Sequence, residues 1–313
     1  MARAPLISVQ DPTARLVGES PAIQALRAEL RYLATFDRVG NPDVPTLLLC
    51  GETGTGKGLV AHVVHDSGPR AQGPFIEVNC AAIPDTLLEA ELLGYEAGAF
   101  SEAKRAKPGL FEAASGGTLF LDEIDALPLA LQGKLLTALE AKRVRRLGAV
   151  REQAVDVKLI AAAQSELRGA VQAKQFRADL YHRLAVVELL LPPLRSRGED
   201  ILVLAQEYIH RYAAAYRMQS KQLSRAAAAW LLGYGWPGNV RELSHLVERV
   251  ILLSPEPIVE AATLERLHLP PAIPTTPEDR PPGSKADPPQ DEAPGSGRLW
   301  MRQGVMSCRR RSC

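Results

Sequence analysis

Short apolar segments alternate with stretches of helical periodicity in the first part of the chain. The segments TLLLC, PFIEVNC, TLFLDEI, VDVKLIAAA and AVVELLL have the length and apolar content of buried strands; they are residues 46–50, 74–80, 118–124, 155–163 and 185–191. Residues 57–67 and 129–141 between them have the pattern of helices. Strands that alternate with helices predict an α/β domain, a parallel sheet flanked by helices on both faces, over residues 16–193.

The pattern changes after this domain. Residues 191–200 (LPPLRSRGED) form a linker punctuated by Pro and Arg, and residues 201 to about 268 are helical apart from the turn-forming GYGWPGN at 233–239. We therefore expect a small helical lid domain over residues 194–268. Residues 1–15 are expected to be a flexible N-terminus, and the Pro-rich polar segment 269–313 a disordered tail.

Composition narrows the class of protein but does not identify it. The 313 residues carry a formal net charge of +1, so overall charge does not favour nucleic acid or an anionic membrane. No apolar run is long enough to span a bilayer, and the N-terminus lacks the apolar core of a signal peptide, which predicts a cytoplasmic protein. The four cysteines form no CxxC pair, which argues against a zinc site or a disulfide framework.

A glycine-rich segment between a predicted strand and a predicted helix has the context of a P-loop. Its residues, all assigned to nucleotide binding, are Gly51, Glu52, Thr53, Gly54, Thr55, Gly56, Lys57 and Gly58. The glycines let backbone amides turn toward phosphate oxygens, and Lys57 places an ammonium at the β- and γ-phosphates. The sequence therefore predicts ATP binding, although Gly58 stands where the motif usually has a Ser or Thr ligand for magnesium.

Two acidic residues end the predicted strand at 118–124. Asp122 and Glu123 would lie at the carboxyl edge of the sheet, where open α/β sheets bind ligands. We expect Asp122 to hold Mg²⁺ through water and Glu123 to polarise the attacking water as a general base.

With these motifs in order, residues 16–268 resemble the AAA+ domain of sigma-54-dependent transcriptional activators, the bacterial enhancer-binding proteins. LVGESPAIQ at 16–24 resembles the opening segment of the family, which implies that Val17 and Gly18 contribute to the adenine pocket. FIEVNCAAIP at 75–84 implies that Asn79 restrains the catalytic Glu until the ring is engaged.

The resemblance also implies a homo-oligomeric, hexameric ring. FRADLYHRL at 176–184 matches the segment whose two arginines, here Arg177 and Arg183, reach the γ-phosphate of the neighbouring subunit. On spacing alone, these arginines could instead pair with Asp179 and nearby acids in their own helix. WPGNVRELSHLVERV at 236–250 matches the lid signature, in which Arg241 points back to the nucleotide.

The loop that would contact the partner departs from the family. The usual hexapeptide GAFTGA reads GAFSEA here, and its residues are Gly98, Ala99, Phe100, Ser101, Glu102 and Ala103. The implied partner is the sigma-54 RNA polymerase holoenzyme, but Glu102 adds bulk and charge where the family has a glycine. Near the γ-phosphate, Gln164 follows Ala163 where the family commonly has Thr-Asn.

Three functions stay open at this point. The leading one is an ATPase that remodels sigma-54 polymerase, and the second is a nucleotide-binding regulatory module that no longer activates sigma-54. A P-loop kinase for a small molecule is disfavoured, because it has no use for the lid and the paired arginines. No direct DNA-binding domain of the helix-turn-helix type is visible, although KRVRR at 142–146, expected to lie on a helix, is a candidate contact to polymerase or DNA.

Overall fold

The computed structural model describes residues 11–41, 44–164 and 167–268. Internal contacts divide the chain into one unit, Met1–Pro270, and a second, Pro271–Cys313. The second unit, which contains most of the tail that the sequence predicts to be disordered, lies outside the described residues.

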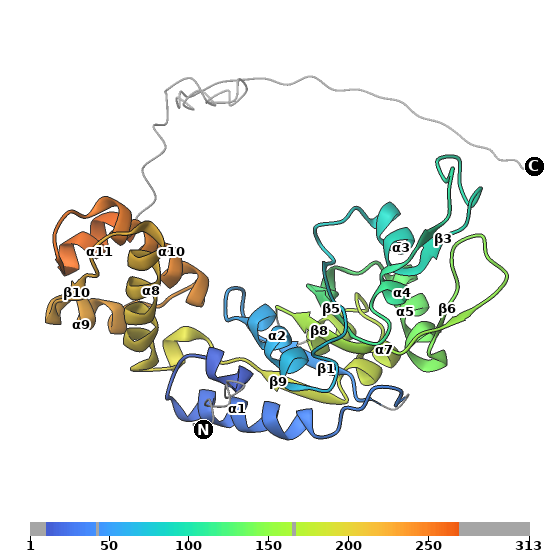
Figure 1. The fold of residues 1–313 in the computed structure, drawn as a ribbon, viewed down its shortest axis with the longest axis horizontal. Helices are drawn as coiled ribbons and strands as arrows, with labels where there is room; N and C mark the ends of the chain where they lie inside the picture. The colour runs from blue at the N-terminus through green and yellow to red at the C-terminus, as the bar shows by residue number, and fades with distance from the viewer. Residues whose placement is uncertain (1–10, 42–43, 165–166, 269–313) are drawn as a thin grey trace, which may run out of the picture. The chain divides into compact units, whose positions relative to one another are not determined.

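A five-stranded parallel sheet forms the centre of the α/β domain, as the sequence predicts (Figure 1). Its strands in spatial order are β2 (Phe75–Asn79), β5 (Thr118–Asp122), β8 (Lys158–Ala163), β1 (Leu47–Cys50) and β9 (Val187–Leu190). Asn79 pairs in register with Asp122, and Cys50 pairs with Ala163. The polar residues that follow these strands are thereby brought to one edge of the sheet.

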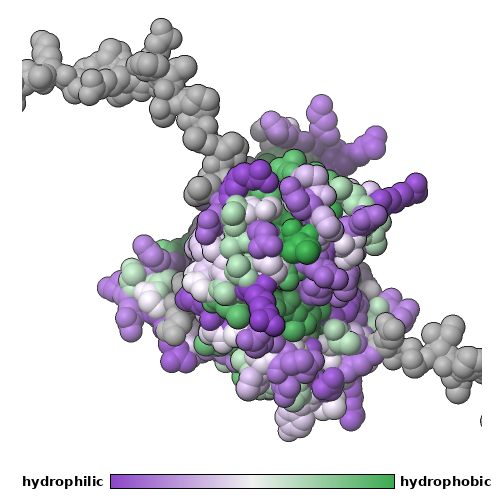
Figure 2. Space-filling model, turned by 90° about the vertical axis from the view of Figure 1, so that its left-hand side faces the viewer, coloured by the Kyte–Doolittle hydropathy of each residue, from purple (hydrophilic) through white to green (hydrophobic). Residues whose placement is uncertain are grey.

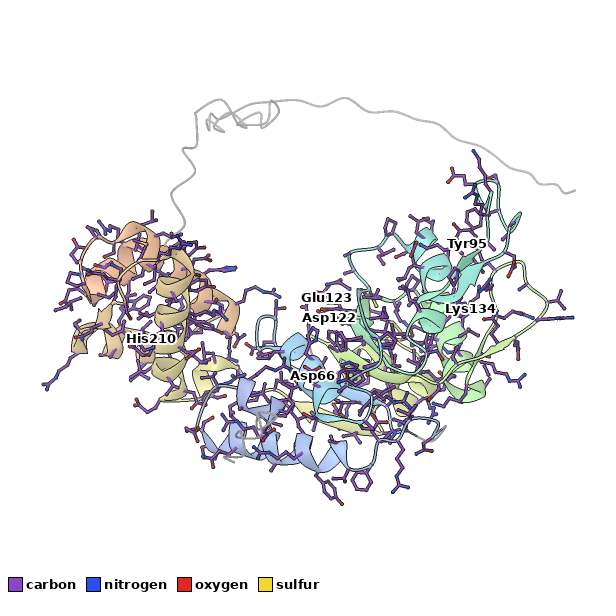
Figure 3. The ribbon with its side chains drawn as sticks, in the orientation of Figure 1. Asp66, Tyr95, Asp122, Glu123, Lys134 and His210 are labelled. Atoms are coloured by element: carbon purple, nitrogen blue, oxygen red, sulfur yellow. The ribbon has the colours of Figure 1, made fainter. Side chains whose placement is uncertain are left out.

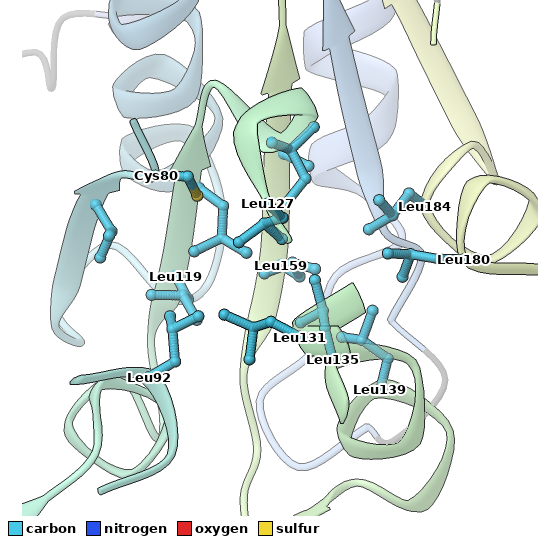
Figure 4. Packing of buried hydrophobic residues seen from close by; sticks show 14 of the residues in the cluster. Cys80, Leu92, Leu119, Leu127, Leu131, Leu135, Leu139, Leu159, Leu180 and Leu184 are labelled. Atoms are coloured by element: carbon cyan, nitrogen blue, oxygen red, sulfur yellow. The ribbon is translucent and has the colours of Figure 1, made fainter. Parts of the chain in front are cut away.

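Helices cover both faces of the sheet because successive strand residues point to opposite sides. Leu119 and Leu121 pack on one side against α3 (Asp85–Leu93), α5 (Leu129–Ala141) and α7 (Ala178–Leu184), as Figure 4 shows for the leucines of this layer. Phe120 points to the other side, where α1 (Pro21–Ala34) and α2 (Lys57–Ser67) lie. Fully burying such a side chain contributes about 1.5–3 kcal/mol, so both layers stabilise the sheet.

Short elements complete this domain. They are η1 (Pro12–Arg15), α4 (Leu110–Ala113), η2 (Ile124–Ala126), α6 (Leu167–Gln172), the hairpin of β3 (Gly94–Tyr95) and β4 (Lys107–Pro108), and the hairpin of β6 (Arg143–Val144) and β7 (Gln153–Ala154).

Two sequence expectations are wrong here. Residues 12–15, expected to be flexible, form the helix η1, because the Asp11 carboxylate caps the Thr13 amide and Thr13 is buried. The basic segment 142–146 is not helical: α5 ends where Lys142 adopts a left-handed conformation with φ of 53°, and the chain continues as β6.

The lid domain is a compact set of helices with its own hydrophobic core. It comprises η3 (Leu194–Ser196), α8 (Asp200–Tyr216), β10 (Gln222–Leu223), α9 (Arg225–Gly233), α10 (Asn239–Leu253), β11 (Ile258–Val259) and α11 (Ala261–His268). Leu243, Leu246, Val247 and Val250 follow the period of a helix and are buried around Trp236. Figure 2 shows one face of the molecule, on which hydrophobic residues reach the surface among hydrophilic ones. Among the described residues, no helix is both long and apolar enough to cross a bilayer.

A buried ionic cluster lies where β8 begins, at the opposite end of that strand from the P-loop. The Asp37 carboxylate accepts hydrogen bonds from Arg70 at 3.1 Å and from Lys158 at 3.0 Å, and Arg70 also reaches Asp156 at 2.7 Å. Burial lowers the pKa of Lys158, and the Asp37 charge opposes that shift. The cluster joins the end of α1 to the amino ends of the strands.

Candidate nucleotide-binding site

The P-loop lies between β1 and α2 and is shaped by its glycines. Gly54 and Gly56 have φ of 80° and 103°, a region that residues with a Cβ rarely occupy. Lys57 is 8% exposed, and its Nζ donates to the carbonyl oxygens of Gly51 at 2.7 Å and Glu52 at 3.3 Å. The ammonium is therefore held inside the turn of the loop.

A cavity of about 410 Å³ opens beside the loop and brings together residues from distant parts of the chain. The residues in its wall that the sequence predicts are Thr53, Gly54, Gly56, Lys57, Gly58, Asp122, Glu123, Gln164 and Arg241. Others were missed by sequence reasoning: Leu59, Tyr208, Tyr212, Val240, Ser244, His245 and Glu248. Most of these missed residues come from one face of α8 or α10, and their amphipathic spacing signals a packed helix without showing what the helix faces.

Asp122 and Glu123 lie next to each other where β5 ends (Figure 3). The Glu123 amide donates to Asp122 Oδ1 at 3.0 Å, and Glu123 adopts φ of 54° and ψ of 49°. A left-handed backbone at a residue other than glycine is strained and is often found at functional sites. Both carboxylates reach the cavity that Lys57 lines, which suits paired roles in metal binding and water activation.

Burial affects the protonation of these groups in opposite directions. Burial raises the pKa of Asp122 above its usual range, and the neighbouring Lys57 charge works against that shift. Burial lowers the pKa of Lys57, while Asp122 opposes it. Each charged group therefore stabilises the ionised form of the other in a partly desolvated site.

Glu123 has a different neighbour from the one the family resemblance implies. Among the described residues, no hydrogen bond joins Asn79 to Glu123; Asn79 Oδ1 accepts from the amides of Ala81 at 2.9 Å and Ala82 at 3.1 Å. Gln164 Nε2 instead lies 3.4 Å from Glu123 Oε1. In this conformation the long Gln164 side chain, and not Asn79, is hydrogen-bonded to the predicted general base.

Space is available for a side chain at Gly58. A Cβ built there would have only Glu77 Oε1 and Phe120 Cε1 near it, both at 3.9 Å, which is ordinary van der Waals contact. The hydroxyl of Thr55 is already used, since it donates to the Glu52 carbonyl at 2.8 Å. A magnesium ion fits this donor set if the Asp122 carboxylate and water supply its ligands, because Mg²⁺ commonly retains several waters.

A second cavity, of about 520 Å³, adjoins the loop on the side of the opening segment. Val17, Thr55 and Tyr208 are among its lining residues. Gly18 is not among them, but its carbonyl accepts from Arg27 at 2.7 Å. The Asp200 carboxylate also fixes this segment through the amides of Glu19 at 2.6 Å and Ser20 at 2.9 Å.

Arg177, which caps the start of α7, and Arg183 within α7 do not line either cavity in their own chain. Arg177 donates to both Asp179 carboxylate oxygens, at 3.0 Å and 2.7 Å, and this pairing lowers the pKa of Asp179 to about 2. Arg183 donates to the Leu139 carbonyl at 3.3 Å. Within a single chain, Arg177 therefore adopts the local pairing that its sequence spacing also allows.

The predicted contact loop joins β3 to β4 and is closed by hydrogen bonds within its own backbone. The Gly98 amide donates to the Ala103 carbonyl at 2.8 Å, and the Ala103 amide donates to the Phe100 carbonyl at 3.0 Å. Phe100 is 39% exposed, and its ring meets Tyr95 edge-on at 4.9 Å between centroids. Glu102 is exposed and is not among the described residues with positive φ, so a glutamate occupies this position without backbone strain.

Comparison with known proteins matches both domains to the family that the sequence motifs resemble. Residues 16–190 match the family model described as the sigma-54 interaction domain, and residues 195–281 match the AAA+ ATPase lid domain. The nitric oxide reductase transcription regulator NorR1 of Cupriavidus necator is 48% identical over 237 residues, 76% of this chain and 45% of that protein. The response regulator protein PilR of Pseudomonas aeruginosa is 46% identical over 239 residues, 76% of this chain and 52% of that protein.

Solved structures agree with this result. NtrX of Brucella abortus, crystallised with ADP, has a TM-score of 0.72 and 34% identity, covering 80% of this chain and 54% of that one. The same protein crystallised with ATP has a TM-score of 0.72, covering 85% of this chain and 57% of that one. This chain spans about half the length of the curated relatives that it matches. It belongs to the sigma-54 interaction domain family, the AAA+ domain of sigma-54-dependent transcriptional activators.

Proposed function

We propose that this chain binds ATP with Mg²⁺, hydrolyses it in a cytoplasmic hexameric ring, and uses the hydrolysis to remodel sigma-54 RNA polymerase. The observation that carries the proposal is the convergence of Lys57, Asp122, Glu123 and Arg241 on one cavity of about 410 Å³. These residues supply a cation, a pair of carboxylates and a second cation from the lid, which are the kinds of group that catalyse phosphoryl transfer to water. The complexes of NtrX with ADP and with ATP support a nucleotide as the ligand.

Each residue has a distinct task in this reaction. Lys57 would exchange its bonds to the loop carbonyls for phosphate oxygens, and Arg241 would approach the same phosphates from α10. Glu123 would orient and deprotonate the attacking water, with Gln164 and Asn79 as candidates to restrain it. Asp122 would hold magnesium through water, and the bound ion would neutralise charge on the phosphates.

The neighbouring subunit would complete the site. Because Arg177 and Arg183 lie outside the cavities of their own chain, they are free to serve the site of the next subunit. An arginine supplied in this way can be worth about 10³–10⁵ in rate. The Arg177–Asp179 pair is exposed to solvent, which screens the attraction between its charges, so Arg177 can exchange Asp179 for a phosphate at little cost.

A second function is favoured by one observation. Glu102 places an exposed carboxylate in the loop that would meet sigma-54, which supports a nucleotide-binding regulatory module that no longer activates this partner. Both functions use the same nucleotide site and differ only in what the loop contacts.

ATP turnover measured against protein concentration tests the enzyme. A ring that shares its sites between subunits predicts a specific activity that rises with concentration as the ring assembles. Turnover that stays absent at concentrations where sedimentation detects the ring would contradict the proposal.

A further inference from the structure

Three consecutive carbonyl groups of the P-loop accept hydrogen bonds from residues that follow the α/β domain in the sequence. The Thr53 carbonyl accepts from Asn239 Nδ2 at 3.0 Å, and the Thr55 carbonyl accepts from an Arg197 Nη atom at 3.1 Å. Between them, the Gly54 carbonyl accepts from the Arg241 amide at 3.3 Å. The outer side of the loop is thus fastened by the lid and by the segment that leads into it.

Fastening a carbonyl also fixes the direction of an amide. A peptide unit is planar and trans, so its C=O and N–H point in opposite directions. The carbonyls of Thr53 and Thr55 share their peptide units with the amides of Gly54 and Gly56. Neither amide has an acceptor within the described part of the chain, and both glycines line the cavity of about 410 Å³. Two amides are therefore left to converge on an anion.

The burial and backbone conformation of Asn239 fix its side chain against the Thr53 carbonyl. It is 0% exposed, and its φ of 52° is a conformation that Asn and Asp adopt more readily than most residues. Its Nδ2 also donates to Glu52 Oε2 at 3.1 Å, and its Oδ1 accepts the Leu194 amide at 2.8 Å. Every polar group of the side chain is therefore paired.

The Glu52 side chain, on the P-loop, accepts hydrogen bonds from Asn239 and from Arg195 of the lid. Arg195 donates to its two carboxylate oxygens at 2.8 Å and 2.5 Å. This pairing and the Asn239 bond lower the pKa of Glu52 to about 2, so Glu52 is ionised at neutral pH. The side chain of Glu52, a residue that the sequence assigns to nucleotide binding, pairs with lid residues and does not line the cavity of about 410 Å³. A Cβ at Gly54 would overlap the Gly238 carbonyl, so this position also needs glycine for close contact with the lid.

We propose that Asn239 and Arg197 are positioning residues for the phosphates of a nucleoside di- or triphosphate. By holding the Thr53 and Thr55 carbonyls toward the lid, they aim the amides of Gly54 and Gly56 at the phosphate oxygens before the ligand arrives. Such preorganisation improves affinity by removing the cost of ordering the loop on binding. The inference rests on the proposed function only in requiring a nucleotide as ligand.

The variant Asn239→Asp tests this role with little change in shape. Aspartate keeps the acceptor for the Leu194 amide, but it places a carboxylate against the Thr53 carbonyl and the Glu52 carboxylate. Calorimetry should show a rise of about tenfold in the Kd for ADP, equivalent to about 1.4 kcal/mol. The Kd for adenosine should stay unchanged, because adenosine has no phosphate for the amides to meet.

A second substitution separates this electrostatic effect from general damage. In the double variant Asn239→Asp with Glu52→Gln, the amide introduced at position 52 can donate to the carboxylate introduced at position 239, and part of the lost ADP affinity should return. Glu91→Gln, which removes an exposed pair with Lys107, is the matched control and should bind ADP like the parent. If thermal unfolding shows that Asn239→Asp does not fold, Arg197→Met removes the donor to the Thr55 carbonyl and should likewise raise the Kd for ADP; because Arg197 also lines the second cavity, adenosine is not its control.

Equal losses of ADP and adenosine affinity, or unchanged ADP affinity in folded variants, would overturn the inference. In that case binding of ADP by the parent would leave the proposed function intact. A parent chain that binds neither ADP nor ATP would overturn both.

Discussion

At the scale of single residues, Gly58 stands where the P-loop motif usually has a Ser or Thr whose hydroxyl binds magnesium. Neighbouring atoms lie 3.9 Å from a Cβ built there, so a small side chain fits without displacing the loop. Gly58→Ser should therefore lower the Mg²⁺ concentration needed for half-maximal ATP turnover by about threefold to tenfold, since a hydroxyl can replace a water ligand. Gly58→Ala adds the Cβ without the hydroxyl and serves as the control; an equal effect of both variants would contradict the explanation.

The buried carboxyl of Asp122 has a stability consequence that can be separated from catalysis. Its pKa is raised in the folded state, so the folded protein binds more protons than the unfolded chain just above pH 3.8, and ionised Asp122 destabilises the fold at higher pH. Without nucleotide or Mg²⁺, Asp122→Asn should raise the Tm at about pH 7, and the gain should shrink as the pH falls toward 3.8.

Thermal unfolding of the two proteins across this pH range gives the comparison. A variant that is less stable than the parent at about pH 7 would show that contacts of the carboxylate outweigh its desolvation.

How much of the site the sequence predicts depends on how far apart its residues are. Lys57, Asp122 and Glu123 can be predicted because each lies at or after the carboxyl end of a strand in one parallel sheet, whose edge brings them together. Asn239 and Arg197 cannot, because nothing local to their segments shows that they contact loop carbonyls more than a hundred residues away. Arg241 was found only through the family resemblance.

At the scale of elements, the buried cluster around Asp37 secures α1 to the sheet. Asp37→Asn would leave Lys158 and Arg70 in a buried site without a full counter-charge. Removing one partner of a buried pair typically costs about 3–5 kcal/mol, so we expect a loss of that size in the free energy of unfolding by denaturant. Glu91→Gln breaks an exposed pair and should cost less than about 1 kcal/mol. Equal losses in the two variants would contradict the structural role of the cluster.

The strands of the sheet and two of the helices between them could be predicted from periodicity, and the structure confirms them. Helices α2 and α5 have the bounds that the pattern predicts. The prediction of a helix at residues 142–146 is wrong. Lys and Arg have high helix propensity, but the pairing of Arg143 with Ala154 in a hairpin overrides that preference. Such pairing depends on a distant partner strand, which composition does not reveal.

At the scale of the whole molecule, our proposal places Arg177 and Arg183 at the site of a neighbouring subunit, so that activity would belong to an assembly. If Arg177 acts on the site of the next subunit, Arg177→Ala should bind ATP like the parent and lose about 10³-fold or more in turnover. Lys57→Ala should lose nucleotide affinity but keep its arginines. Mixing the two inactive variants should restore part of the turnover, since some interfaces then pair an intact loop with an intact Arg177.

The matched control for this mixture is Lys57→Ala combined with the double variant Lys57→Ala, Arg177→Ala, which has no intact P-loop. Recovery in the control, or no recovery in the test mixture while both variants form rings, would contradict action across the interface.

The central claim is that nucleotide hydrolysis here acts on sigma-54 polymerase, and it depends on the loop around Phe100. The most direct test is the binding of purified sigma-54 holoenzyme to the chain with ADP and aluminium fluoride, which together imitate the transition state. The account predicts a complex that depends on the nucleotide, is lost in Phe100→Ala, and is strengthened in Glu102→Gly. If the parent hydrolyses ATP but neither it nor Glu102→Gly forms the complex, the claim is contradicted and the chain is a nucleotide-binding module with another partner.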